Sequence, residues 1–350
     1  MLRGIAPQHF CPYRLQSVTY YVSMERIKRD AKRVFEVKHV FLINPKAGRG
    51  NAFEAVKNMV DGRENCEIRN TGSPEDTIRY IRERSNGAQS EEICYIACGG
   101  DGTVNTVANG VLSAHNACMS ILPLGSGNDY VKAYGGKESF LDIEKLLSAE
   151  PHPVDVIRVN DRYCINAFHF GLDSAVANTM NQVKPKPIIG GRNAYSTGVV
   201  KALICSMRTP CTIRVDGEAF HSGDMLLCTV TCGEFVGGSY RCAPRTRVDD
   251  GMAEICLVKP VSRLRFLKLM NAYKLGEHLT DPRFRQVIQY RRGRVIEVEG
   301  GPGFLVSLDG EVVTGDSFRA EVIPGKLRFV SVNAPNNGWA DMDASPLAVH

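Results

Sequence analysis

The sequence lacks the long apolar run that a membrane-spanning helix needs, since no stretch of about 18 apolar residues occurs in its 350 residues. It also lacks a Cys-x-x-Cys pair, and most of its 12 cysteines lie inside apolar runs. We therefore expect buried, reduced thiols in a cytosolic protein, and neither disulfides nor a structural zinc site. Residues 1–37 contain no small-residue cleavage site after an apolar core, so they are expected to form an arm and not a signal peptide.

An excess of one charge is also missing. The 43 Lys and Arg residues and the 38 Asp and Glu residues leave a formal net charge of only +5, spread evenly along the chain. This excess is too small to predict a nucleic-acid partner, but it suits anionic nucleotides or an anionic membrane surface. With 43% hydrophobic residues, the composition is that of a globular protein that is long enough for two domains.

Residues 38–152 alternate short apolar runs with helical patterns, which is typical of a parallel sheet covered by helices. The predicted strands are Val40–Ile43, Cys66–Thr71, Ile93–Ala97 and Ser120–Leu124, and the predicted helices are Phe53–Val60, Pro74–Arg84, Val104–Val111 and Ile143–Leu147. We predict a three-layer α/β nucleotide-binding domain whose ligand lies at the carboxyl ends of the strands.

A turn with three glycines around one carboxylate, Cys98-Gly99-Gly100-Asp101-Gly102-Thr103-Val104-Asn105, follows the third predicted strand. Glycine allows positive φ angles and the close approach of phosphate groups, and Thr103 is placed to cap the next helix. Asp101 would repel phosphate oxygens unless a cation lies between them. The turn therefore predicts a nucleotide with Mg²⁺, and a Gly-rich turn without a ligand is the alternative.

Similar loops follow the other strands. Asn44-Pro45-Lys46-Ala47-Gly48 adds a cation close to the first strand, Thr71 ends the second, and Gly125-Ser126-Gly127-Asn128-Asp129 follows the fourth. Asn-Pro and Gly are ordinary turn residues, so each loop alone is a weak signal. Two glycine-bracketed aspartates after successive strands strengthen the prediction of a phosphate site at this edge of the sheet.

Residues 153–332 read as short strands with two helical interruptions, at Thr197–Met207 and Val261–Leu275. This pattern predicts an antiparallel β-sandwich domain, whose last segment is allowed to return to the first domain, followed by a tail at 333–350. Asp309-Gly310 is typical of a hairpin turn. The segment Lys184–Met207 is interpreted either as a cover over an acyl chain or as a plain core helix.

Taken in order, these motifs resemble the diacylglycerol kinase catalytic domain family, which includes bacterial diacylglycerol kinases, sphingosine kinases and ceramide kinases. The resemblance covers roughly residues 39 to 330. It is carried by the Asn44–Gly48 loop, the Gly99–Asn105 turn, Leu122–Asp129, Val154-Asp155-Val156, Ala243-Pro244, Val248-Asp249-Asp250-Gly251 and Asp309-Gly310-Glu311. Each piece is weak alone, and the joint signal is strong.

The resemblance implies ATP-dependent phosphorylation of a lipid hydroxyl at a membrane surface, with ATP and Mg²⁺ in the cleft between the domains. The residues that it assigns to ATP are Asn44, Pro45, Lys46, Ala47, Gly48, Thr71, Gly99, Gly100, Asp101, Gly102, Thr103, Val104, Asn105 and Ser126. It places Asp101, Asp129 and Asp155 around the catalytic Mg²⁺, and Glu311 as the general base. It also implies a structural Mg²⁺ held by the Asp250 carboxylate and the carbonyls of Arg247 and Met252.

The acceptor is not specified by these motifs. Diacylglycerol is the first choice, because the chain lacks the long insertions of many sphingoid-base kinases, and phosphatidylglycerol, ceramide, a sphingoid base or an undecaprenol-like alcohol are alternatives. NAD kinases and phosphofructokinases share the Gly-Gly-Asp-Gly turn, and a catalytically silent lipid-binding protein is a further reading. Exposed sandwich edges suit a homodimer.

Overall fold

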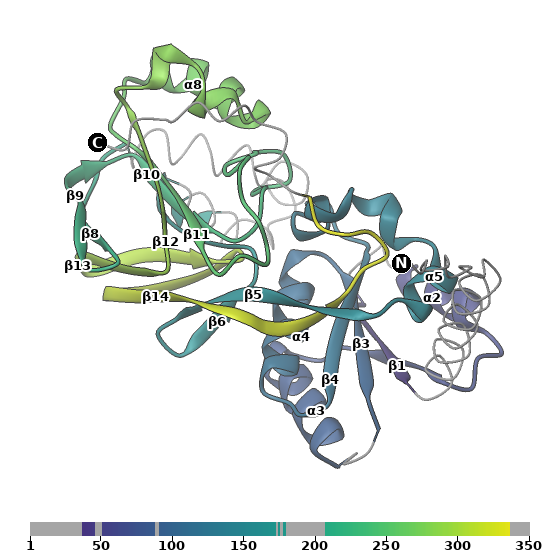
Figure 1. Cartoon of the computed structure of the whole chain (residues 1–350). Coiled ribbons are helices and arrows are strands. Elements are labelled where there is room, and N and C mark those ends of the chain that lie inside the picture. The colour runs from purple at the N-terminus through teal and green to yellow at the C-terminus, as the bar shows by residue number, and fades with distance from the viewer. Residues whose placement is uncertain are drawn as a thin grey trace, which may run out of the picture.

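The computed structural model describes residues 37–45, 51–87, 91–172, 174–175, 178–179 and 207–336. Figure 1 shows two lobes, with strands β5 (Pro151–Val159) and β14 (Glu311–Val330) running from one to the other. We call them the N-terminal lobe, before β5, and the C-terminal lobe. The predicted arm, most of the predicted helix at 197–207 and most of the tail lie outside the described residues. None of the described helices has the length and apolarity needed to cross a bilayer.

The N-terminal lobe contains the parallel sheet that the alternating pattern predicts. Its strands lie in the order β4-β3-β1-β2, and all three pairings are parallel. The elements are β1 (Lys38–Ile43), α2 (Ala52–Val60), β2 (Cys66–Asn70), α3 (Pro74–Gly87), β3 (Ile93–Gly99), α4 (Asp101–Leu112), β4 (Ala117–Pro123) and α5 (Ile143–Ser148). Every residue of β3 and β4 is buried, which is why these strands read as continuous apolar runs.

Helices cover both faces of this sheet. On one face, the Tyr95 hydroxyl lies 2.9 Å from Ser85 Oγ of α3. On the other face, Cys94 and Cys118 line a small cavity together with Leu147 of α5. The predicted N-cap of α3 is confirmed, since Ser73 Oγ accepts a hydrogen bond from the Asp76 N–H at 3.1 Å. The three-layer α/β class is therefore confirmed.

The C-terminal lobe is antiparallel throughout its described strand pairs, in the order β12-β11-β10-β7-β13-β14, with β8 beside β13 and β9 beside β8. Its further strands are β6 (Arg162–Cys164), β7 (Ala167–Gly171), β8 (Thr209–Val215), β9 (Glu218–Met225), β10 (Leu227–Thr231), β11 (Ala253–Val258), β12 (Ile288–Gly293) and β13 (Val295–Leu308). Helix α8 (Arg263–Leu275) packs outside the sheet, where the periodicity predicts a helix. The short 3₁₀ turns are Tyr130–Tyr134, Lys137–Phe140, Glu277–Leu279 and Pro282–Phe284.

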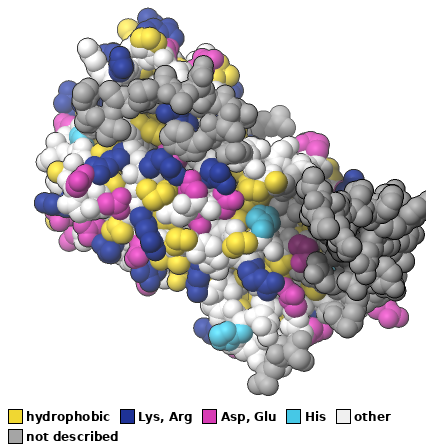
Figure 2. Space-filling view, viewed as in Figure 1, with side chains coloured by type: hydrophobic (Ala, Val, Ile, Leu, Met, Phe, Trp, Pro, Cys, Tyr) yellow, Lys and Arg dark blue, Asp and Glu magenta, His cyan; other side chains and the backbone are white. Residues whose placement is uncertain are grey.

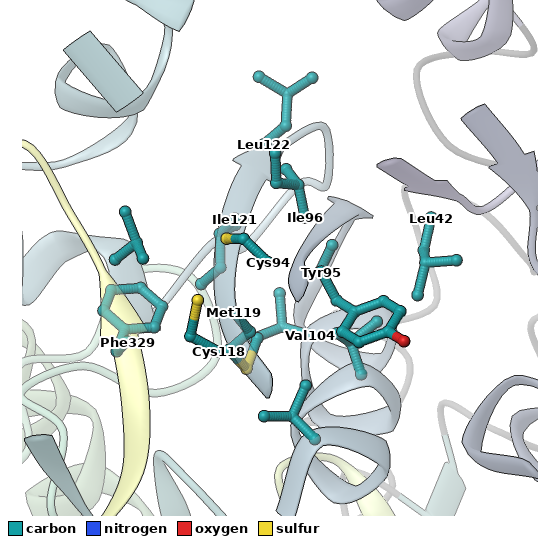
Figure 3. Close-up of a cluster of buried hydrophobic side chains, with 14 of the residues drawn as sticks. Leu42, Cys94, Tyr95, Ile96, Val104, Cys118, Met119, Ile121, Leu122 and Phe329 are labelled. Carbon is teal, nitrogen blue, oxygen red and sulfur yellow. The ribbon is translucent and has the colours of Figure 1, made fainter. Parts of the chain in front are cut away.

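Strand β14 joins the two lobes into one 14-stranded sheet. It pairs antiparallel with β13 and β5, and at its end Phe329 pairs in parallel with Met119 of β4. Figure 3 shows the Phe329 ring beside the apolar side chains of β4. The ring also lies 5.2 Å from that of Tyr130 and 5.1 Å from that of Tyr134, measured between centroids. Strand β14, the last of the described strands, thus completes the core of the first lobe.

His278, which follows α8, is buried and makes the stability of the fold sensitive to pH. Only 1% of its surface is exposed, and its ring centroid lies 4.4 Å from that of Tyr273. Burial lowers the pKa of His278 from 6.5 to about 4, because the charged form is not solvated in the core.

We expect the contribution of His278 to the free energy of unfolding to be present in full above pH 6.5 and to be lost as the pH drops from 6.5 to 4, so that the parent loses stability relative to a variant without this histidine. In that window the unfolded chain binds a proton that the folded chain excludes, which costs up to about 3 kcal/mol. Urea unfolding across this range, on the parent protein and on His278→Phe, measures the effect. An equally steep pH profile in the variant would contradict the assignment to His278.

Candidate functional site

Four turns meet at the carboxyl edge of the parallel sheet. The Asn44 N–H donates to the Cys98 carbonyl at 3.1 Å, and the Thr71 N–H donates to the Ile43 carbonyl at 2.8 Å. The Leu124 N–H donates to the Gly99 carbonyl at 2.9 Å, which joins the third and fourth turns. The loops that the sequence singles out are therefore neighbours in space. Lys46, Ala47 and Gly48 lie outside the described residues.

Thr103 does not cap α4, contrary to the prediction. The helix begins at Asp101 with Gly100 as its N-cap, so Thr103 lies within the first turn, where its N–H donates to the Gly100 carbonyl at 2.9 Å. Its buried hydroxyl oxygen accepts a hydrogen bond from Asn44 Nδ2 at 3.1 Å. Thr103 therefore connects the first loop to the glycine turn. Asn44 is the residue it holds in place.

None of the glycines of the third and fourth turns has a positive φ angle, and two of them, Gly125 and Gly127, allow close packing. A Cβ on Gly125 would meet the Cα of Gly100 well inside van der Waals contact and would lie 2.9 Å from Asn128 Oδ1. A Cβ on Gly127 would lie 2.5 Å from Asp101 Oδ2. Gly102, in contrast, faces open space, with nothing within 4 Å of its would-be Cβ. The two loops therefore touch through their backbones.

Asp101 and Asp129 form the acidic centre of this edge. Asp101 accepts hydrogen bonds from the N–H groups of Asn128, at 3.0 Å, and Asp129, at 2.7 Å. Burial and the neighbouring Asp129 carboxylate raise the pKa of Asp101 to about 6. A Cβ on Gly127 would lie 3.7 Å from Asp129 Oδ2 as well as close to Asp101, so carboxylate oxygens of both residues face the space above Gly127. A hard cation with oxygen ligands would relieve the repulsion between the two carboxylates, as the Lys132 ammonium already does in part for Asp129.

Asp129 also connects the two lobes. Both of its carboxylate oxygens accept from the Gly238 N–H at 3.0 Å, and Lys132 Nζ donates to the Asp129 carboxylate at 2.6 Å and to the Gly238 carbonyl at 2.8 Å. The loop between β10 and β11 is thus held at both its N–H and its carbonyl. This clamp fixes the orientation of the Asp129 side chain toward the glycine turns.

Asp155 lies at a different place from Asp101 and Asp129. Its carboxylate accepts from the N–H of Gly251 at 2.6 Å and from that of Gly325 at 2.8 Å, and burial raises its pKa. It borders a cavity of about 900 Å³ whose other polar lining includes His152, Asp249, Asp250, Arg294, Ser331 and Asn333. No described contact joins it to Asp101. The structure therefore divides the predicted group of three aspartates into a pair and a separate residue.

Asp250, the carboxylate of the predicted structural magnesium site, is paired with the side chain of an arginine. One carboxylate oxygen of Asp250 pairs with the Arg292 guanidinium, and the other accepts from the Met252 N–H at 3.1 Å. Arg292 also lies 2.9 Å from the buried Glu254 carboxylate. Within the described part of the chain, no cluster of three His, Cys, Asp or Glu residues could hold a metal. The Arg292 guanidinium therefore lies beside the carboxylate that the resemblance assigns to Mg²⁺, and a Mg²⁺ held by Asp250 with the carbonyls of Arg247 and Met252 stays a prediction.

Asp309, which the sequence places in a hairpin turn and in the Asp309-Gly310-Glu311 motif without a role of its own, lies at the junction of the two lobes. The turn is confirmed, since Asp309 and Gly310 have φ angles of 48° and 91° between the paired Leu308 and Glu311. The Asp309 carboxylate accepts four hydrogen bonds of 2.8–3.1 Å, from Asn105 Nδ2 and the N–H groups of Ile165, Asn166 and Ala167. It also contributes to the raised pKa of Asp101.

Asn105, a predicted ATP contact, takes part in the same hydrogen bonds. Its amide donates to Asp309 at 2.8 Å and to the Tyr163 carbonyl at 3.2 Å, so it joins α4 to the C-terminal lobe. Glu311, the predicted base, is exposed and accepts from Arg162 at 2.6 Å. Among the other predicted nucleotide contacts, Pro45 and Ser126 are exposed at the strand ends and Val104 is buried in the core.

Two family models match the chain. The diacylglycerol kinase catalytic domain matches residues 38–159, and the YegS C-terminal NAD kinase beta sandwich-like domain matches residues 166–331. The chain is 30% identical over 279 residues to the probable lipid kinase YegS-like of Chromohalobacter salexigens, covering 78% of this chain and 86% of that protein. It is also 30% identical over 220 residues to the diacylglycerol kinase of Bacillus subtilis, covering 62% of this chain and 70% of that protein.

The fold is also found in solved structures. A putative diacylglycerol kinase from Bacillus anthracis superposes with a TM-score of 0.65 at 22% identity, covering 84% of this chain and 96% of that one. A second structure, described as a diacylglycerol kinase of the same species, gives a TM-score of 0.62. These likenesses concern the fold, and the sequence matches supply the family. The chain belongs to the lipid kinase family that carries the diacylglycerol kinase catalytic domain.

Proposed function

We propose that this protein transfers the γ-phosphoryl group of ATP to the hydroxyl group of a membrane lipid, with diacylglycerol as the preferred acceptor. The observation that carries the proposal is the meeting of four turns and the N-terminus of α4 around Asp101 and Asp129. Backbone N–H groups at a helix start attract phosphate, and glycines without side chains let it approach. Activity at a membrane surface on the cytoplasmic side follows from such an acceptor.

The proposed reaction forms one bond and breaks another. The lipid oxygen attacks the γ-phosphorus, the bond to the β-phosphate oxygen breaks, ADP leaves, and the hydroxyl proton passes to a carboxylate, for which Glu311 is our candidate. Mg²⁺, when bound, would neutralise phosphate oxygens beside Asp101 and Asp129. The clamp at Gly238 would keep Asp129 aimed at that place, and the Asp309 contacts would hold the second lobe against α4.

The choice of diacylglycerol is supported by the names of relatives, one of which is a diacylglycerol kinase from Bacillus subtilis. The relatives named only as lipid kinases leave ceramide, sphingoid bases and phosphatidylglycerol as further candidate acceptors. NAD remains the alternative from a different substrate class, because the glycine turn is shared with NAD kinases.

The test is transfer of radiolabelled phosphate from ATP into a vesicle panel of single lipids, with NAD as a soluble acceptor. We expect a labelled lipid whose formation falls at least 100-fold in Asp101→Ala, because positioned charge and proton transfer supply factors of about 10²–10⁴.

Glu311→Gln is expected to lose turnover while keeping ATP binding. Asp316→Asn, an exposed carboxylate of β14, is the matched control. Label in NAD alone, or full activity in Asp101→Ala, would overturn the proposal.

A further inference from the structure

Helix α8 exposes large apolar side chains on the outside of the C-terminal lobe. Leu264, Leu267 and Leu275 are 76%, 55% and 52% exposed. The opposite side of the same helix is buried, where Phe266 and Tyr273 pack in the core. A helix that needed only to cover this core would carry polar residues on its outer face. The three leucines therefore point to something outside the lobe that covers them.

The leucines lie together, with cations on both sides. At 100° per residue, the directions of Leu264, Leu267 and Leu275 fall within about 80° of one another around the helix. Arg263 and Lys274 lie along one margin of this stripe, and Arg265 and Lys268 along the other. All four cations are exposed, and residues 263–275 include no Asp or Glu.

Few acidic residues follow the helix closely in the sequence. Two acidic residues follow the helix, Glu277 and Asp281, and Asp281 is paired with Arg283. The Arg265 guanidinium donates to the Arg283 backbone carbonyl at 2.9 Å, which holds it beside α8. Figure 2 shows hydrophobic and basic side chains together at the top of the view, over the position of α8 in Figure 1.

We propose that this face of α8, defined by Leu264, Leu267 and Leu275 with their flanking cations, docks on an anionic membrane surface. An apolar stripe sinks into the boundary between headgroups and acyl chains, while Lys and Arg at its margins bind the anionic headgroups. A second copy of the chain would bring four like charges against these four, which disfavours a symmetric contact. A nucleic acid would match the cations but not the leucines. The inference rests on the proposed lipid kinase function for the presence of a membrane.

The experiment measures partitioning of the full chain onto phosphatidylcholine vesicles with and without phosphatidylglycerol. Three variants are compared with the parent: Leu264→Gln/Leu267→Gln/Leu275→Gln, Arg263→Gln/Lys268→Gln/Lys274→Gln, and the control Phe53→Gln/Met59→Gln, which removes exposed apolar side chains of α2. We expect the leucine variant to lose at least about tenfold in partitioning onto anionic vesicles. At low salt, the cation variant should bind anionic vesicles as weakly as the parent binds them at high salt. The substitutions and the screening by salt remove the same electrostatic attraction to the headgroups.

The outcomes separate docking from catalysis. Kinase activity on lipid in detergent micelles is expected to be unchanged in the leucine variant and in the control. Partitioning of the leucine variant equal to that of the parent would overturn the docking surface, whatever the kinase assay gives. A parent dimer that the leucine variant converts to a monomer, with vesicle binding intact, would assign the face to a contact between copies. Loss of vesicle binding without any lipid ever becoming labelled would leave the surface standing and remove the kinase proposal.

Discussion

Asp309→Ala is expected to lower the free energy of unfolding by about 3 kcal/mol, because three backbone N–H groups and the Asn105 amide lose a charged acceptor at once. The contacts reach from α4 to the segment between β6 and β7, so their loss loosens the junction of the lobes and not only one turn. Urea unfolding at neutral pH measures the difference. Asp309→Asn, which keeps one acceptor oxygen, is expected to fall between the parent and the alanine variant.

The chain offers a matched control for this prediction. Asp216 is also the first residue of a two-residue Asp-Gly turn, with a φ angle of 52° against 48° for Asp309. Its carboxylate accepts from the N–H groups of Arg294 and Val295, but it is exposed, so water replaces it in Asp216→Ala. Backbone strain is therefore the same in both alanine variants. Equal destabilisation of the two would show that the turn, and not the inter-lobe contacts, sets the stability.

Gly125→Ala is expected to cost about 2–3 kcal/mol of stability and to abolish ATP binding, because the new methyl group would collide with the backbone of Gly100. The Asn128 side chain can move aside, but the Gly100 atoms belong to the backbone, so the third and fourth turns have to separate. Separation moves Asp101 away from the N–H groups of Asn128 and Asp129 that hold it. Thermal unfolding and ATP titration measure the two effects independently.

Gly102→Ala provides the comparison within the same motif. Its Cβ would meet nothing within 4 Å, and alanine is favoured over glycine in a helix by up to about 1 kcal/mol. We expect this variant to fold at least as stably as the parent while binding ATP more weakly, because the open space beside Gly102 is where phosphate would lie. Loss of stability in Gly102→Ala, or normal stability in Gly125→Ala, would contradict this separation of packing from binding.

The N-terminal lobe follows from local patterns in the sequence. Its strands are buried on both faces, so Ile93–Ala97 and its neighbours read as apolar runs, and Ser73 marks the start of a helix through its capping bond. The gathering of loops at one edge then follows from parallel pairing alone. The structural role of the glycines cannot be predicted in this way, because the contact between Gly100 and Gly125 depends on how closely the two loops approach each other.

The hydrogen-bond partners of the carboxylates could not be predicted from the sequence. Asp101 and Asp129 follow neighbouring strands and meet as expected, but Asp155 binds the N–H groups of Gly251 and Gly325, which are distant along the chain. The Asp-Gly turn already explains the presence of Asp309, so the sequence gives no sign of the four donors that its carboxylate binds. Arg292 occupies the carboxylate of Asp250 only because β12 pairs with β11. Each of these contacts is set by register between strands and not by a local motif.

The pairing of β14 with β4 has a consequence for how the protein is made. Ser120 and Val330, whose hydroxyl and carbonyl are 2.8 Å apart, are separated by 210 residues. The core of the first lobe therefore stays incomplete on the ribosome until β14 has emerged. Such long-range closure is slow, and it exposes the open edge of β4 to other nascent chains meanwhile. The first lobe thus completes its fold only after strands β5–β13 of the second part of the chain have been synthesised.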